Sequence, residues 1–170
     1  DGATEFTYSI ANQPAKGTLS LENNLVTYIP NYNENGADLF TYRCNDGIDS
    51  ENAASVPITI NPINDGPTAN DDTATTDEDI PVKIEVLAND EDPDIINGDV
   101  LTITSVTIPR SIEDYYSHGS TVLSEDSKSI TFTPGEDIDD DMYFDYAITD
   151  GSGETSTARV IVTVNAINDA

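Results

Sequence analysis

The segment NDEDPDIINGD, residues 89–99, carries five carboxylates and no basic residue. Two carboxylates held about 5 Å apart repel each other by roughly 1–3 kcal/mol, depending on how much water surrounds them. A segment that collects so many of them is either disordered or binds a cation. Asp90, Asp92 and Asp94 occupy the first, third and fifth positions of a possible EF-hand loop, so a calcium site is the first chemistry to consider.

The rest of the EF-hand pattern is missing. The sixth position of that loop turns sharply and is Gly, whereas this chain has Ile95, and the twelfth is a bidentate Glu, whereas this chain has Leu101. The glycine-rich nonapeptide of parallel β-rolls is absent as well. Ligands for a cation must therefore be brought together by the tertiary fold.

The composition excludes several classes of function. Lys plus Arg is 6 and Asp plus Glu is 33, a formal net charge of −27, so we expect no nucleic-acid partner, because phosphate binding requires basic clusters. The chain has no apolar run of about 18 residues, so we expect no direct membrane insertion. One His and one Cys leave little material for zinc binding or catalysis. Paired carboxylates could serve a glycosidase, but these lie in loops, so we expect no enzyme.

The sequence contains an internal repeat. Three pairs of segments share an offset of 104 residues, whereas EFTYSI (5–10) matches VLTITS (100–105) with a shorter offset. The second repeat therefore carries an insertion of about nine residues within RSIEDYYSHG (110–119). The three pairs are TYIP (27–30) with TFTP (131–134), FTYRCNDG (40–47) with FDYAITDG (144–151), and NPINDG (61–66) with NAINDA (165–170).

Apolar residues alternate with polar ones throughout both repeats, and this period of two predicts half-buried antiparallel strands. Hydrophobic residues make up 36% of the chain and lie in register, which argues against disorder. Seven short strands in roughly 100 residues are typical of an immunoglobulin-like β-sandwich. The second repeat supplies all seven, which we call A to G, near 73–77, 81–88, 100–108, 119–124, 129–134, 142–149 and 155–165.

The first repeat supplies only strands C to G. We therefore predict a partial sandwich over residues 1–63 and a complete one over 64–170, with the counterparts of strands A and B lying ahead of Asp1. Such a partial sandwich has an unpaired edge, which predicts strand exchange with another copy or strands supplied upstream. Cys44 occupies an inward position of strand F, where we expect a small buried side chain rather than a reactive thiol.

This fold predicts where the acidic residues gather. The B–C and F–G loops of a seven-strand sandwich lie at the end where the chain enters, so they should meet the linker there. The opposite end carries Asp77, Glu78, Asp79 and the acids between 136 and 141. Hard oxygen ligands in such numbers suit Ca²⁺ better than Mg²⁺ or zinc. The candidate ligands at the entering end are Asn61, Asn64 and Asp65 of the linker, Asp90, Asp92, Asp94 and Asp99 of the B–C loop, and Asp150 of the F–G loop.

The ordered set NPINDGP, TDEDIPV, LANDEDPD, NGDVLTITSV and FDYAITDGSGETSTARVIVTVN resembles the cadherin-like tandem repeats of giant bacterial surface adhesins. The resemblance implies an all-β fold of tandem immunoglobulin/cadherin-like Greek-key sandwiches, with Ca²⁺ at the junctions. The resemblance implies calcium ligands in the acidic linker, in the D-x-D pair after strand B and at the F–G aspartate. It also implies a ligand at Asp46, the F–G aspartate of the first repeat. Glu78 after strand A would serve the next junction downstream. Two departures are Asn61, where Asp is usual, and NYNENGAD (31–38), which has no matching acid pair.

Two functions remain open. The first is a structural extender of an extracellular bacterial adhesin, in which Ca²⁺ stiffens the junctions between neighbouring repeats and other domains hold any surface ligand. The second is a calcium-dependent module that binds a glycan or peptide, for which the only positive feature is the pair Tyr115 and Tyr116 in the insertion.

Overall fold

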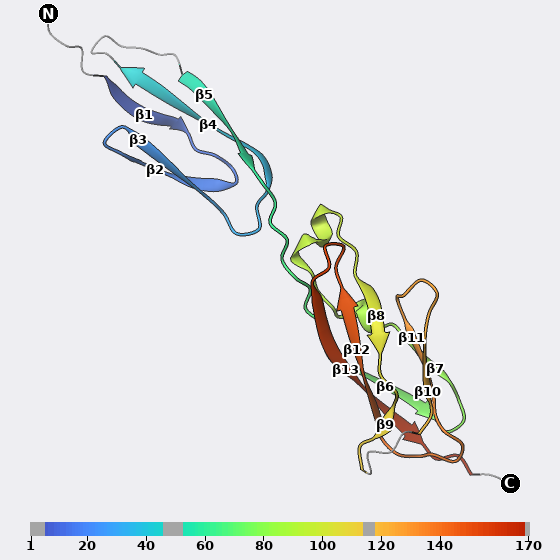
Figure 1. Cartoon of the computed structure of the whole chain (residues 1–170). Coiled ribbons are helices and arrows are strands. Elements are labelled where there is room, and N and C mark those ends of the chain that lie inside the picture. Colours follow the sequence, from blue (N-terminus) through green and yellow to red (C-terminus); the bar gives the residue numbers. More distant parts are fainter. Residues whose placement is uncertain (1–5, 46–52, 114–117, 169–170) are drawn as a thin grey trace, which may run out of the picture. The chain divides into compact units, whose positions relative to one another are not determined.

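The computed structural model describes residues 6–45, 53–113 and 118–168. The chain folds into two compact units, Asp1–Ile63 and Asn64–Ala170. Both are built from β-strands, and the only helical turns in the described residues are two short 3-10 segments of the second unit. The predicted all-β fold class is therefore confirmed (Figure 1).

The second unit contains two sheets. One has the strand order β6-β13-β12-β8, with β9 also pairing β12, and the other has the order β10-β11-β7. The elements are β6 (Asp72–Asp77), β7 (Val82–Ile84), η1 (Val86–Ala88), η2 (Pro93–Asn97), β8 (Thr102–Val106), β9 (Arg110–Ser111), β10 (Ser120–Leu123), β11 (Ile130–Thr133), β12 (Met142–Thr149) and β13 (Thr155–Asn165).

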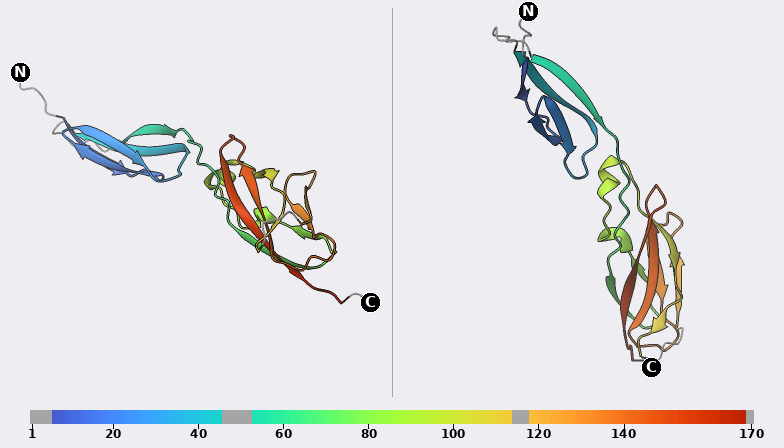
Figure 2. Two further views of the ribbon diagram at one scale, coloured as in Figure 1. Left: turned by 60° about the horizontal axis from the view of Figure 1, so that its bottom comes forward. Right: turned by 60° about the vertical axis from the view of Figure 1, so that its left-hand side comes forward.

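The two sheets enclose one apolar core, as expected of a sandwich. Figure 2 gives two further views of their strands. Alternate residues of β12 and β13 face inward, and Phe144, Ile148 and Val160 are fully buried. Ile130 and Phe132 of β11 close the core from the other sheet, and both are also fully buried. The rigid core thus fixes the strand ends from which the acidic loops project.

Strand B departs from its prediction. The alternation of Val82, Ile84 and Val86 predicts one strand over 81–88, but β7 ends at Ile84 and Val86–Ala88 form a 3-10 turn. Glu85 has φ −88° and ψ 69°, outside the extended region, so the ladder stops there. Val86 is nevertheless fully buried, because the turn directs it into the core. The spacing indicated burial correctly and the strand length incorrectly.

The first unit also forms two sheets, with orders β1-β4-β5 and β2-β3. Among its described residues, Phe40 is the only hydrophobic side chain that is buried. Cys44 is half-buried rather than buried, so the prediction of a buried thiol was wrong. The elements are β1 (Thr7–Asn12), β2 (Gly17–Glu22), β3 (Leu25–Pro30), β4 (Gly36–Asn45) and β5 (Ala53–Ile60).

Candidate cation site

Asp92 lies at the start of η2 and, with Asp72, is one of two described acidic residues that have a buried side-chain oxygen without a hydrogen-bond partner. Its Oδ1 accepts a 2.7 Å hydrogen bond from the backbone N–H of Asp94, which caps the short helix. Its Oδ2 is buried and has no hydrogen-bond partner, although the residue is only 8% exposed. A buried carboxylate oxygen without a partner is costly, and it indicates a ligand that completes the site.

Two further carboxylates face Asp92. One oxygen each of Asp92, Asp99 and Asp150 lies within 4.8 Å of the others. Gly98 ends η2 with φ 103°, a left-handed conformation that returns the chain toward the F–G loop. Oδ1 of Asp99 then accepts a 3.0 Å hydrogen bond from the backbone N–H of Gly151. Local turn geometry therefore brings the B–C and F–G carboxylates together.

Asp150 organises the turn between β12 and β13. Its Oδ1 accepts hydrogen bonds from the backbone N–H groups of Ser152, Gly153 and Glu154, at 2.9, 2.5 and 2.8 Å. Its Oδ2 accepts a 2.8 Å bond from the side-chain amide of Asn64. The pKa of Asp150 is held below its ordinary value, chiefly by the hydrogen bond from Asn64. The backbone donors also lower this pKa, and burial opposes them. Asp150 is therefore a preformed carboxylate anion at neutral pH.

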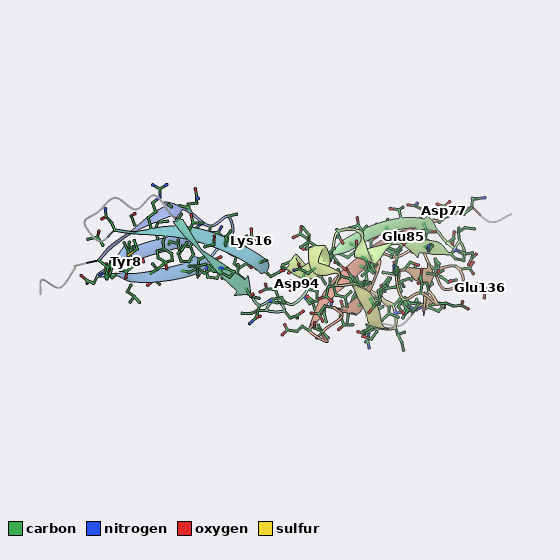
Figure 3. The ribbon with its side chains drawn as sticks, turned by 90° about the horizontal axis from the view of Figure 1, so that it is seen from above. Tyr8, Lys16, Asp77, Glu85, Asp94 and Glu136 are labelled. Atoms are coloured by element: carbon green, nitrogen blue, oxygen red, sulfur yellow. The ribbon has the colours of Figure 1, made fainter. Side chains whose placement is uncertain are left out.

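The first residues of the second unit are tied to the same loops. The backbone N–H of Asp65 donates a 2.8 Å hydrogen bond to Oδ2 of Asp94. Thr68 and Glu91 form an isolated antiparallel bridge, with N–H to O distances of 2.7 and 3.0 Å. Asn64, Asp65 and Asp94 thus lie around the Asp92, Asp99 and Asp150 cluster, and Figure 3 shows Asp94 at one end of this unit, with Asp77 and Glu136 at the other.

This donor set fits a hard divalent cation. Within the described residues, the cluster offers only oxygen atoms, and three like charges at this separation repel one another. A cation would reverse that repulsion and give the unpaired oxygen of Asp92 a partner. Zinc would require His or Cys ligands, which the cluster lacks, whereas Ca²⁺ takes several carboxylate and amide oxygens.

Asp90, also predicted as a ligand, lies in a different environment. Its oxygens accept bonds from the backbone N–H of Asn70 at 2.8 Å and lie 3.0 and 3.2 Å from the hydroxyl of Tyr146. The D-x-D pair is therefore divided, with Asp90 held beside the core and Asp92 facing the cluster.

The remaining candidate residues are spread over the molecule. Asn61 is exposed directly after β5 in the first unit. Glu78 is buried at the far end of the second unit, where its Oε1 accepts a hydrogen bond from the backbone N–H of Ile167 and its own N–H donates to Asn165 O at 2.8 Å. The three candidates Asp46, Tyr115 and Tyr116 lie outside the described residues.

The sequence-based reasoning overlooked the glycines and the turn that position the carboxylates. A Cβ atom added at Gly151 would collide with Oδ1 of Asp99, so only glycine allows that approach. The signal was present in the run DGSGE after β12, because a carboxylate followed by two glycines is typical of a turn that caps its own backbone.

The β-sandwich fold and the acidic loops at its end are features of a known class of protein, and comparison with known proteins identifies the family. The bacterial Ig domain family model matches residues 1–59 and 64–163, so the chain belongs to the bacterial Ig domain family. The two matches coincide with the two halves of the internal repeat. The predicted cadherin-like, immunoglobulin-like bacterial repeat is thus confirmed.

Solved structures show the same fold at low sequence identity. Human mucin-like protocadherin EC1-2 is 18% identical with a TM-score of 0.60, and the match covers 95% of this chain and 85% of that one. Mouse cadherin-23 EC22-24 is 16% identical, also with a TM-score of 0.60, over 95% of this chain and 53% of that one. Among curated proteins, integrin beta-like protein A of Dictyostelium discoideum is 30% identical over 138 residues, which is 75% of this chain and only 7% of that protein.

Proposed function

We propose that this chain is a calcium-binding spacer of a bacterial surface adhesin, in which Ca²⁺ stiffens the peptide that enters the second unit. The single observation that carries the calcium site is the buried, unpaired Oδ2 of Asp92 beside Asp99 and Asp150. Asn64 and Asp65 are the first residues of that unit, so an ion bound there would hold the connection that leads into it. Both functions that the sequence left open include calcium.

The spacer role rests on the architecture. The family is bacterial, the chain is a tandem of two similar units, and immunoglobulin-like and cadherin-like domains are typically extracellular. No helix in the described part of the chain is long and apolar enough to cross a membrane. Neighbouring repeats of the same chain are the natural partners of such a unit, and no catalytic step is part of this proposal.

Calorimetric titration of the whole chain with CaCl₂ tests the site directly. Extracellular calcium modules bind with dissociation constants of roughly 10⁻⁴–10⁻³ M. At about 10 mM Ca²⁺ such an affinity stabilises the folded state by about 1–3 kcal/mol, so the melting temperature should rise and should fall again in chelator. Mg²⁺ should bind more weakly, because it favours octahedral sites with several waters.

Two variants separate a specific site from general screening of the acidic surface. Asp92→Asn removes the unpaired carboxylate and should abolish the calorimetric signal of this site. Glu91→Gln removes one charge from the exposed neighbouring residue and should leave that signal intact. If both variants respond to Ca²⁺ as the parent does, the carboxylates are solvated surface groups and the proposed site does not exist.

A further inference from the structure

The described residues of the first unit leave its two sheets open along one side. Within its described residues, β3 pairs only with β2, and β5 pairs only with β4, so each sheet has an unpaired edge. Between the sheets is a hollow of about 290 Å³. Its walls include apolar and aromatic side chains from all five strands: Ile10, Leu21, Val26, Phe40, Tyr42 and Val56.

The second unit has the same strands and fills the corresponding space. There, β6 pairs in parallel with β13, and β7 pairs with β11 so that Ile84 lies opposite Ile130. Ile84 and Val86 from this segment are 8% and 0% exposed and belong to the core. The first unit has no described strand in either place.

Residues at equivalent positions of the two units differ in how deeply they are buried. Val56 of β5 and Val26 of β3 are half-buried, whereas their counterparts 104 residues later, Val160 and Ile130, are fully buried. The registers agree as well, because Tyr8 lies opposite Cys44 just as Ile103 lies opposite Ile148. The two units therefore share one design, and the described residues of the first contain no strands equivalent to those that cover the core of the second.

We propose that the first unit is completed by two β-strands with the apolar pattern of residues 72–86, carried by the same polypeptide on the N-terminal side of Phe6. The two added strands would pair with the free edges of β3 and β5 through backbone hydrogen bonds. Their side chains equivalent to Ile84 and Val86 would fill the hollow. A second copy is a poorer donor, because lending its own residues 72–86 would uncover the core of its second unit. This inference does not depend on the cation site.

A grafted chain tests the proposal. Phe6 is 49% exposed, whereas its counterpart Leu101 is 7% exposed, so a copy of residues 67–100 can replace residues 1–5 directly ahead of Phe6 with the rest of the chain unchanged. The readout is the thiol of Cys44, the only cysteine of the protein, which is half-buried on the same face of β4 as Phe40 and Tyr42. The graft should slow labelling of Cys44 by a thiol reagent at least tenfold and should raise the melting temperature of the first unit.

The matched control is the same graft with its copies of Val82 and Ile84 both changed to Asp, which places charges in the hollow and should give no protection. Added as a separate peptide, residues 67–100 should slow labelling of the parent chain in a concentration-dependent way. The proposal is overturned if the apolar graft and the control graft label equally fast. It is also overturned if the parent chain is a dimer in which Cys44 is already protected, because a second copy would then be the occupant.

Discussion

The hydroxyl of Tyr146, on the core strand β12, lies 3.0 and 3.2 Å from the two carboxylate oxygens of Asp90. It also lies 3.0 Å from the carbonyl oxygen of Asn70 and 3.3 Å from that of Val86. Burial raises the pKa of Asp90 above its ordinary value, although the hydrogen bonds from the N–H of Asn70 and from the Tyr146 hydroxyl oppose this shift. Burial and the nearby Asp90 carboxylate raise the pKa of Tyr146. The pair joins the base of the acidic loop to the core.

Tyr146→Phe should therefore destabilise the second unit. The substitution keeps the ring and leaves a buried carboxylate with one donor fewer, so we expect a loss of about 1–3 kcal/mol in the free energy of unfolding. Urea denaturation of the whole chain measures it. Tyr143→Phe on the opposite face of β12 is the control, with an expected change below about 0.5 kcal/mol. Equal effects of the two substitutions would contradict the structural role given to the Tyr146 hydroxyl.

Asp92→Asn should stabilise the protein in the absence of metal. An amide still caps Asp94 through its oxygen, and its NH₂ group can donate to Asp99 or Asp150, where the carboxylate only repels. We expect a gain on the order of 1 kcal/mol in chelator and a loss of the calcium response. Thermal melts with and without Ca²⁺ check both effects. A variant that is less stable than the parent in chelator would show that the cluster does not carry the strain inferred from its unpaired oxygen.

Gly151→Ala should weaken calcium binding more than it weakens the fold. The new methyl group would displace the Asp99 carboxylate, while the backbone of the turn need not change. An affinity lowered about tenfold corresponds to about 1.4 kcal/mol. Calorimetry measures the affinity, and Ser152→Ala is the neighbouring control that should bind as the parent does. Unchanged affinity in Gly151→Ala would remove Asp99 from the ligand set.

Asp38 stabilises the first unit in a pH-dependent way. Burial raises the pKa of its carboxyl, but hydrogen bonds from the N–H groups of Ala15, Leu39 and Lys16 and from the Tyr28 hydroxyl outweigh burial and hold the pKa at about 2. Since the folded pKa lies below the ordinary value of 3.8, this stabilisation is complete above about pH 4 and is lost as the pH falls toward 2.

Asp38→Asn should accordingly lower the melting temperature at pH 7, because an amide cannot accept all four bonds. The difference from the parent should shrink between about pH 4 and pH 2, as the parent's own carboxyl becomes protonated. Differential scanning calorimetry over that range measures the gap. A gap that stays constant down to pH 2 would mean that the charge of Asp38 contributes nothing.

The strands were predictable wherever alternation continued to the end of a ladder. The expected strands at 142–149 and 155–165 coincide with β12 and β13, because every second residue of both meets the core. Alternation did not reveal that β7 ends at Ile84, because a 3-10 turn can bury Val86 just as a strand can. The apolar pattern reports which residues are inside and does not report the backbone conformation that places them there.

The candidate site was predictable as a meeting of loops and unpredictable in its details. The order of strands in a sandwich places Asp92 and Asp150 at one end, and the structure brings them together. Which member of the D-x-D pair faces the cluster depends on the position of the Tyr146 hydroxyl, a contact across 56 residues that no local pattern contains. The same holds for Gly151, whose role depends on a carboxylate 52 residues earlier.

The parallel pairing of β6 with β13 has a mechanical consequence. Asp72 lies opposite Val160 and Asp77 opposite Asn165, so the first and last strands of the second unit run in the same direction. A pull on the two ends of this unit would load that ladder in shear, and its hydrogen bonds would have to break together rather than one after another. A unit connected in this way resists tension along its strands, which is the property that the proposed spacer role would require.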